Sequence, residues 1–147
     1  MTASGIEVGE NLIKNSAEIT FGPTEATYNY KTIVTGLTIG ETYTFSAVVE
    51  LDGTDGKRCT IFNYNSSESS ANRPITYAFI ADGTTRDSWT FTAVNTSMIV
   101  YAGDAGHTNG VKATYKHAKL ELGSTPTPWI PNANDYGVAP TSHVFAE

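Results

Sequence analysis

Apolar and polar residues alternate with a period of two along most of the chain, which is the pattern of β-strands whose side chains point to opposite faces. The clearest case is 42–51, whose apolar face holds Tyr43, Phe45, Ala47, Val49 and Leu51. Thr44 and Ser46 fall on its polar face. Eight strands are predicted in this way, at 18–22, 27–35, 42–51, 58–64, 74–81, 88–94, 97–102 and 111–122. Turn residues separate most of them, so the pattern predicts an all-β sandwich or barrel.

Three local features interrupt the alternation. The apolar phase changes within 111–122, and a β-bulge near Lys116 and His117 would produce that change. The segment DGTDGK at 52–57 contains two Asp-Gly pairs, which supply the positive φ angles of a tight hairpin; a calcium loop is a less favoured reading. The run NSSESSANR at 65–73 is polar and of low complexity, and is interpreted as a mobile loop.

The segment KLELGSTPTPWIP at 119–131 predicts the end of the domain. Its three prolines lack an amide donor, so the chain leaves the sheet or follows its edge after this last strand. Trp129 is expected to anchor the exit. We therefore expect an N-terminal connector at 1–10, a β-sandwich module at 11–132 and a C-terminal linker at 133–147.

Composition restricts the possible partners. Nine basic and 15 acidic residues give a formal net charge of -6, which argues against binding to nucleic acid or to an anionic membrane. The N-terminus has no secretory pattern, and no apolar stretch is long enough to span a bilayer. Cys59 is the only cysteine, so no internal disulfide forms, and its position in a strand predicts a buried thiol.

The sequence contains none of the usual catalytic patterns. Most acidic residues lie in turns and connectors, which leaves no evident carboxylate pair for glycoside hydrolysis. The histidines are far apart and match no zinc spacing, and the glycine-rich phosphate-binding motifs are absent. We therefore predict a binding protein without enzymatic activity, cofactor or metal ion.

Three stretches together resemble a known family: ENLIKNS at 10–16, GLTIGETYTFSAVVE at 36–50, and the segment 99–131 from IVYAG to KLELGSTPTPWIP. They are similar to jelly-roll carbohydrate-binding modules of tail and baseplate proteins, distal tail or receptor-binding, from bacteriophages of Gram-positive bacteria. The closing pattern of that family is matched by Lys119, Leu120, Glu121, Gly123, Thr127, Trp129 and Pro131. The resemblance covers Asn11 to Asn132 and implies a jelly-roll β-sandwich of two antiparallel sheets, in which the tryptophan and prolines seal one end without touching ligand.

The resemblance also implies a role in the virion. It suggests a module at the phage tail tip or baseplate, exposed to the host surface, that binds cell-wall polysaccharide or another surface glycan to promote adsorption. Other tail subunits would be partners through the parent protein. A structural spacer or protein-docking module without a glycan site is the alternative, and a hydrolase ranks last. An exposed aromatic platform flanked by polar groups would distinguish the binder from the spacer.

A sugar site needs aromatic rings for the C–H face of the sugar and polar groups for its hydroxyls. The candidates are Tyr28, Tyr30, Asn63, Tyr64, Asn65, Arg73, Arg86, Trp89, Asp104 and His107. The group around Tyr64 is preferred because it leads from a strand into a long polar loop. Tyr28 and Tyr30 share one strand face, as core or as platform, while alternation favours core packing for Trp89. The two arginines would serve an anionic polymer. The other tyrosines, at positions 43, 101 and 115, are interpreted as core or edge residues with a hydroxyl at the surface.

Overall fold

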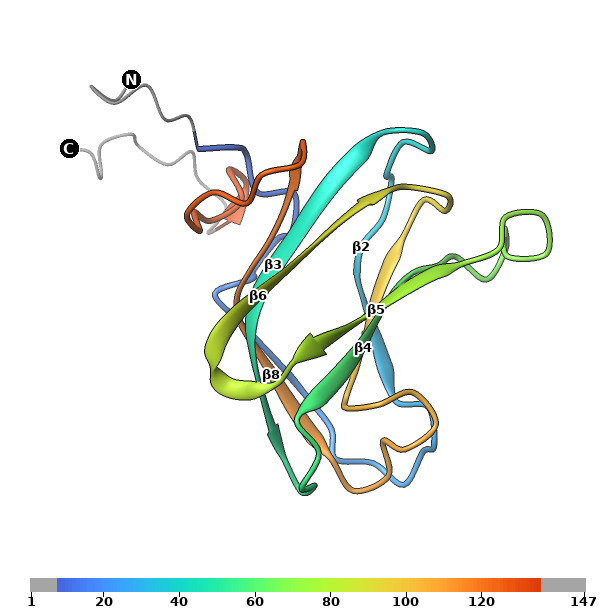
Figure 1. Cartoon of the computed structure of the whole chain (residues 1–147), viewed down its shortest axis with the longest axis vertical. Helices are drawn as coiled ribbons and strands as arrows, with labels where there is room; N and C mark the ends of the chain where they lie inside the picture. Colours follow the sequence, from blue (N-terminus) through green and yellow to red (C-terminus); the bar gives the residue numbers. More distant parts are fainter. Residues whose placement is uncertain (1–7, 136–147) are drawn as a thin grey trace.

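The computed structural model describes residues 8–135 of the chain, and its regular structure is entirely β (Figure 1). Two four-stranded antiparallel sheets form a jelly-roll sandwich, with strand orders β1-β8-β3-β6 and β2-β7-β4-β5. The strands are β1 (Glu18–Phe21), β2 (Tyr30–Val34), β3 (Thr42–Asp52), β4 (Arg58–Asn63), β5 (Ile75–Ile80), β6 (Asp82–Thr92), β7 (Met98–Tyr101) and β8 (Lys112–Leu122). The predicted fold class and all eight predicted strands are confirmed. The expected connector and linker lie mostly outside the described residues.

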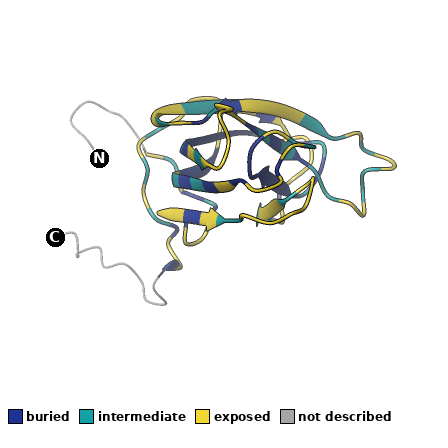
Figure 2. Cartoon of the chain, turned by 90° about the horizontal axis from the view of Figure 1, so that it is seen from below, coloured by how far each residue is buried: buried dark blue, intermediate teal, exposed yellow. Residues whose placement is uncertain are grey.

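The core lies between the two sheets, where buried side chains from β3 and β8 face those from β4, β5 and β7 (Figure 2). Phe45 and Phe79 stack across the interior with their ring centroids 5.2 Å apart, which joins one sheet to the other. The predicted apolar face of β3 is confirmed, since Tyr43, Phe45, Ala47 and Val49 are all buried.

The predicted β-bulge in β8 is confirmed. Ser46 pairs with Lys119 and Val48 with Lys116, so β8 has one more residue than β3 between the two pairs. His117 takes up the extra length with a φ of 49°, in the left-handed region. The bulge moves the apolar phase of β8, so that Tyr115 and Leu120 both face the core.

The segment after β8 packs back over the outer face of the first sheet. Lys119 and Glu121 point away from the core, yet both are fully enclosed. The Lys119 ammonium donates to Thr127 Oγ1 at 2.7 Å and to the Pro128 carbonyl at 2.8 Å, and it lies 3.5 Å from Glu121 Oε1. Glu121 accepts from the Thr127 amide at 2.9 Å. Burial lowers the pKa of Lys119, which the nearby Glu121 carboxylate partly offsets.

The two ends of the described chain are joined beside this segment. The Asn11 side chain donates to the carbonyls of Ala118 and Ile130, and Asn132 donates to the Asn11 carbonyl at 2.7 Å. Trp129 donates from Nε1 to Ser16 Oγ at 3.1 Å. These contacts give a structural reason for the asparagine near the start and for the tryptophan near the end of the matching stretches.

The polar face of β3 is covered as well. Thr44 and Ser46 are buried because the segment after β8 covers the outer face of β3, and Thr44 Oγ1 donates to the Gly123 carbonyl at 2.8 Å.

The prediction of a tight hairpin at 52–57 is wrong, because β3 and β4 belong to different sheets. Gly53 is needed there for a close approach, since a Cβ atom would lie 2.3 Å from the Gly110 carbonyl oxygen.

Strand β6 begins six residues earlier than the alternation at 88–94 predicts, at Asp82 rather than Ser88. The Asp82 carboxylate accepts hydrogen bonds from the Thr85 hydroxyl and from the amides of Thr85 and Thr84, and these bonds hold its pKa below the usual range. The register with β3 shifts between Val48 and Glu50, which accommodates this irregular start. None of the residues 82–87 is buried, so this part of β6 needs no apolar alternation. The sequence pattern therefore gives no sign of the extension.

Candidate functional site

Five aromatic side chains lie together at the outer side of the second sheet. We call this group the aromatic face, and it consists of Tyr28, Tyr30, Phe62, Tyr64 and Tyr101. The alternation within β4 and β7 explains the arrangement. Ile61, Met98 and Val100 point into the core, so the residues between them point outward.

The rings of the aromatic face form a continuous row across three strands. Tyr30 and Tyr101 are directly paired between β2 and β7, and their ring centroids lie 5.5 Å apart. Phe62 on β4 lies 5.6 Å from Tyr101 and 6.5 Å from Tyr64. All three distances fall within the range of direct aromatic contact. The row therefore runs transverse to the strands and ends where the chain leaves β4.

Exposure increases from the middle of the row toward Tyr28. Tyr101 is only 8% exposed, whereas Tyr30 is 46% and Tyr28 is 61% exposed. Burial raises the pKa of Tyr101, and the nearby Tyr30, Tyr64 and Tyr28 hydroxyls raise it further. Tyr101 therefore supports the row from beneath, while Tyr28 and Tyr30 present ring surface to solvent.

A polar loop lies at each end of the second sheet (Figure 1). At the Tyr28 end, the loop 102–110 lies beside the segment before β2, and the Asn109 side chain donates to the Glu25 carbonyl at 3.0 Å. Tyr28 packs over Gly106 in this loop. Asp104 and His107 belong to the same loop and are exposed. The structure therefore places these two predicted residues at the Tyr28 end of the aromatic face.

At the other end, Tyr64 leads into the loop 65–73, which projects beyond the sandwich (Figures 1 and 2). Predicted as a mobile segment, this loop contains hydrogen-bonded turns, and Glu68 accepts from the Thr96 amide and hydroxyl at 2.9 Å each. Asn65 is half-buried and donates to Thr96 Oγ1 at 2.9 Å. Arg73 is exposed at the end of the loop.

Asn63 does not belong to a surface site. It is fully buried, and its side-chain amide donates to the carbonyls of Asn95 and Ser97 at 2.8 and 2.9 Å. Its carbonyl oxygen accepts from the amides of Val94 and Asn95. The prediction of Asn63 as a sugar contact is therefore wrong, because every hydrogen-bonding position of the side chain is used inside the fold.

Two further predicted residues lie away from the aromatic face. Trp89 on β6 stacks between Tyr77 and Phe91, with ring centroids 5.9 and 4.4 Å apart, on the core side of the first sheet. This agrees with the expected packing role. Arg86 lies on the outer face of the first sheet, where it donates to Ser46 Oγ at 2.9 Å. Neither side chain joins the group around Tyr64.

Phe62 and Tyr101 were missed by the sequence reasoning. Phe62 had a signal, because it alternates with Tyr64 in the stretch FNYN and so shares its face. Tyr101 had none, since its position beside Tyr30 follows from pairing between β2 and β7. The expectation of a surface hydroxyl also fails for Tyr115, whose hydroxyl donates inside the core to the Tyr101 carbonyl at 2.6 Å.

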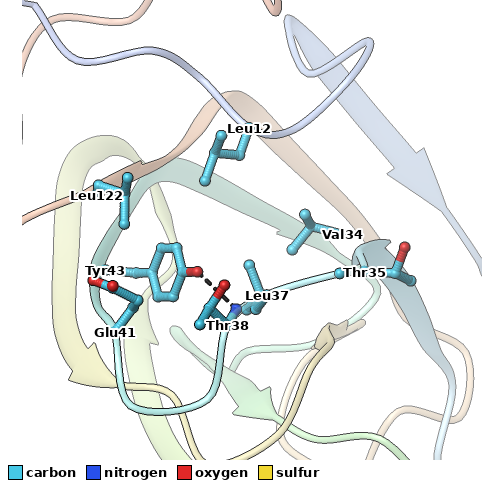
Figure 3. Close-up of a pocket in the computed structure, with 9 residues that line it drawn as sticks. Leu12, Val34, Thr35, Leu37, Thr38, Glu41, Tyr43 and Leu122 are labelled. Atoms are coloured by element: carbon cyan, nitrogen blue, oxygen red, sulfur yellow. Dashed lines mark hydrogen bonds between the residues drawn. The ribbon is translucent and has the colours of Figure 1, made fainter.

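Other cavities lie along the side of the sandwich near β2. One of about 340 Å³ is lined by Leu12, Val34, Thr35, Gly36, Leu37, Thr38, Glu41, Tyr43 and Leu122 (Figure 3). The Tyr43 hydroxyl points across it and accepts from the Thr38 amide at 2.9 Å. The cavity offers both apolar and polar surface, since Thr35 and Glu41 line it together with the leucines. None of the ten predicted site residues lines it.

Within residues 8–135, no three His, Cys, Asp or Glu side chains come together as a metal site. No helix in that part of the chain is long and apolar enough to cross a membrane.

Comparisons with known proteins find remote likenesses. No family model matches the sequence, and no curated protein matches it. One solved structure with a similar fold contains the CBM22-1 and GH10 modules of endo-1,4-β-D-xylanase 10B from Clostridium thermocellum, complexed with xylohexaose. The identity is 14%, the TM-score is 0.41, and the match covers 86% of this chain and 30% of the xylanase chain.

A second solved structure is the tripod from the baseplate of bacteriophage Tuc2009. The identity is 17%, the TM-score is 0.40, and the match covers 86% of this chain and 59% of the tripod chain. The chain thus spans less than two thirds of either protein chain that it matches. At these identities and scores, no residue role and no activity is carried over from either protein.

Proposed function

We propose that this chain is a non-catalytic carbohydrate-binding module, with the aromatic face as its saccharide site. The observation that carries the proposal is the row of contacting rings across β2, β7 and β4, of which Tyr28 and Tyr30 are exposed. Such an exposed platform, with polar loops at both ends, is the feature expected of a binder and not of a spacer. The module is taken to extend from 11 to 132.

The chemistry of a sugar ring suits this surface. Its axial C–H groups form an apolar face that packs against an aromatic ring, while its hydroxyls need hydrogen-bond partners at the rim. Tyr28 and Tyr30 supply both, because each ring carries a hydroxyl that donates and accepts. Asp104 and His107 at one end of the row, and Arg73 at the other, would contact hydroxyls of neighbouring sugar units.

We further propose that the parent protein belongs to a bacteriophage tail tip or baseplate and that the glycan lies on the host cell surface. Support for this part comes from the closing pattern Lys119 to Pro131 in the sequence. The buried contacts of Lys119, Glu121 and Thr127 supply a structural reason for that pattern. Other tail subunits would then be partners, and neither nucleic acid nor membrane would be bound.

An open aromatic face should bind a single glycan weakly, because it encloses little of the sugar surface. The costs of desolvation and ordering reduce the binding free energy further. Several copies in a symmetric assembly would raise the effective concentration and turn weak sites into firm adhesion. A multivalent form of the module should therefore bind cells far more tightly than the monomer.

The experiment uses fluorescently labelled chain, as monomer and as a streptavidin-linked tetramer, on intact Gram-positive cells. Purified cell-wall polysaccharide serves as competitor, and a Tyr28→Ala/Tyr30→Ala variant as the site control. Binding that the polysaccharide competes and the variant lacks is the expected result. If the wild-type tetramer binds no cells across several host strains, the proposal fails and the structural spacer replaces it. Release of soluble sugar from wall material would instead indicate a hydrolase.

A further inference from the structure

A second concave site lies on the other sheet, away from the aromatic face. It is a cavity of about 280 Å³ between β6 and the segment after β8, lined by Ser46, Arg86, Asp87, Ser88, Pro126, Thr127 and Pro128. The two prolines come from the segment that covers the buried Lys119. The proposed saccharide site uses none of these residues.

Arg86 is fixed in this cavity by one edge of its guanidinium. Its Nη2 donates to Ser46 Oγ at 2.9 Å and makes a longer contact of 3.5 Å with the Ser46 carbonyl. Ser46 is buried while Arg86 is exposed, so this anchor lies at the boundary between the protein and solvent. A guanidinium carries five N–H donors, and no residue in 8–135 accepts from Nε or Nη1 of Arg86. One side of the group is therefore held while the other is left free.

Arg86 forms no ion pair in the described part of the chain. Burial lowers the pKa of its guanidinium, and the Glu121 carboxylate partly offsets that effect. No carboxylate oxygen of residues 8–135 lies within 4.0 Å of its guanidinium. Asp87 also borders the cavity, but its two carboxylate oxygens accept from the amides of Ser88 and Ile80. Glu121 is nearby and is already bonded to Thr127 and Lys119. A fixed, unpaired cation thus lines a cavity of a protein whose net charge is -6.

Ser88 adds a second donor beside Arg86. The two residues alternate along β6 and therefore point to the same outer face. Ser88 pairs directly with Ser46, which anchors the guanidinium. Its hydroxyl bonds to no residue in the range 8–135 that the structure describes, and the residue is half-buried at the cavity wall.

We propose that this cavity binds an oxyanion, a phosphate or carboxylate group, with Arg86 as the anchoring cation and Ser88 as a neutral donor. A guanidinium edge matches two oxygens of either group, and hydrogen bonds between charged partners are stronger than neutral ones. Pro126 and Pro128 line the cavity beside these two donors.

The test is a titration followed by amide NMR spectra, with inorganic phosphate as one probe and acetate as the other, at constant ionic strength set with sodium chloride. Saturable shifts confined to Ser88, Thr127 and their neighbours are expected. The probe that saturates at lower concentration identifies the preferred oxyanion. The Arg86→Gln variant should weaken that binding by at least roughly tenfold, since a charged hydrogen bond is lost.

Arg58→Gln is the matched control, because it removes the same charge from an exposed position on β4 of the other sheet, where the guanidinium donates to the Ala78 carbonyl at 3.3 Å. It should leave the affinity unchanged. Ser88→Ala keeps the guanidinium and should weaken oxyanion binding several-fold. This variant tests the proposed site if Arg86→Gln does not fold. Shifts that spread over the surface, or that Arg58→Gln reduces as much as Arg86→Gln, would overturn the proposal. Tyr30→Ala should leave oxyanion binding unchanged, and this result would show that the oxyanion site is distinct from the saccharide site.

Discussion

The rings of Tyr30 and Tyr101 lie 5.5 Å apart on neighbouring strands of the second sheet, with Tyr101 nearly buried and Tyr30 about half exposed. The buried ring holds the exposed one in place. Because directly paired residues in an antiparallel sheet point to the same side, the pairing fixes both rings at the outer surface. This relationship makes Tyr30 the most informative position for testing the proposed saccharide site.

Replacing Tyr30 with alanine should lower the affinity for the cell-surface glycan by roughly three- to tenfold, because one exposed stacking ring is lost. Stability should fall by only about 1 kcal/mol, the scale of a cross-strand aromatic pair. Calorimetric titration with a wall-polysaccharide fragment and thermal unfolding of the same samples would measure both quantities.

Tyr77→Ala is the matched control for that variant, since Tyr77 has a similar exposure of 40% but stacks on Trp89 between the sheets, at the edge where β5 and β6 meet. Its affinity for glycan should stay at the wild-type value. Equal losses of affinity in the two variants would argue against the aromatic face.

The buried contacts beneath the segment after β8 predict that substitutions of Lys119 and Glu121 have non-additive effects on the free energy of unfolding. Lys119→Met and Glu121→Leu should each destabilise the fold by roughly 3–5 kcal/mol, because each leaves one charge buried without its partner. The double variant removes both charges and should cost less than the sum of the two. Urea unfolding of the four proteins gives the coupling energy, and strict additivity would show that the two side chains do not interact.

Alanine substitutions at two glycines with positive φ angles would distinguish the cost of backbone strain from the cost of a steric clash. Gly53 and Gly40 have φ values of 101° and 97°, but only at Gly53 would a Cβ atom meet neighbouring backbone, the Gly110 carbonyl. Gly40→Ala should cost about 1–2 kcal/mol from the left-handed conformation alone. Gly53→Ala should cost roughly 3 kcal/mol or more, because the loop must also move. Similar melting temperatures for the two variants would contradict this structure of the 52–57 loop.

The buried Cys59 thiol predicts a loss of stability at alkaline pH. Burial raises its pKa from an ordinary 9.0 to about 11, against the smaller lowering effects of hydrogen bonds from Tyr115 and Gly103. Because the folded state holds the thiol proton more tightly, the associated stability is fully present below pH 9. It is lost as the pH rises through 11, by roughly 3 kcal/mol at about 1.4 kcal/mol per pH unit.

Urea unfolding at pH values from 8 to 11 would measure this loss. Cys59→Ala should reduce the slope of the unfolding free energy against pH by the equivalent of about one proton. Tyr115, whose pKa is also raised by burial, contributes to this slope at higher pH. A thiol reagent should modify the wild-type protein at neutral pH only on unfolding. Rapid modification of the folded protein would contradict the enclosed position of Cys59.

The sequence by itself determined the eight strands, the bulge at His117 and the exit of the chain after Leu122. These features are local. Alternation with a period of two reports strand faces, a change of phase reports an inserted residue, and proline removes an amide donor wherever it stands. The resemblance in the closing segment depends equally on consecutive residues, and the structure supplies its physical reason in the contacts of Lys119, Glu121 and Thr127.

The tertiary structure alone decided which of the candidate residues meet. Alternation predicts on which face of its own strand Tyr30 or Tyr101 lies. Only the strand order β2-β7-β4 places the two residues side by side. The same is true of Asn63, which the pairing turns inward, and of Arg86, which belongs to the other sheet. The physical reason is that strand partners and register are set by contacts between distant segments, which carry no signal in the spacing of neighbouring residues.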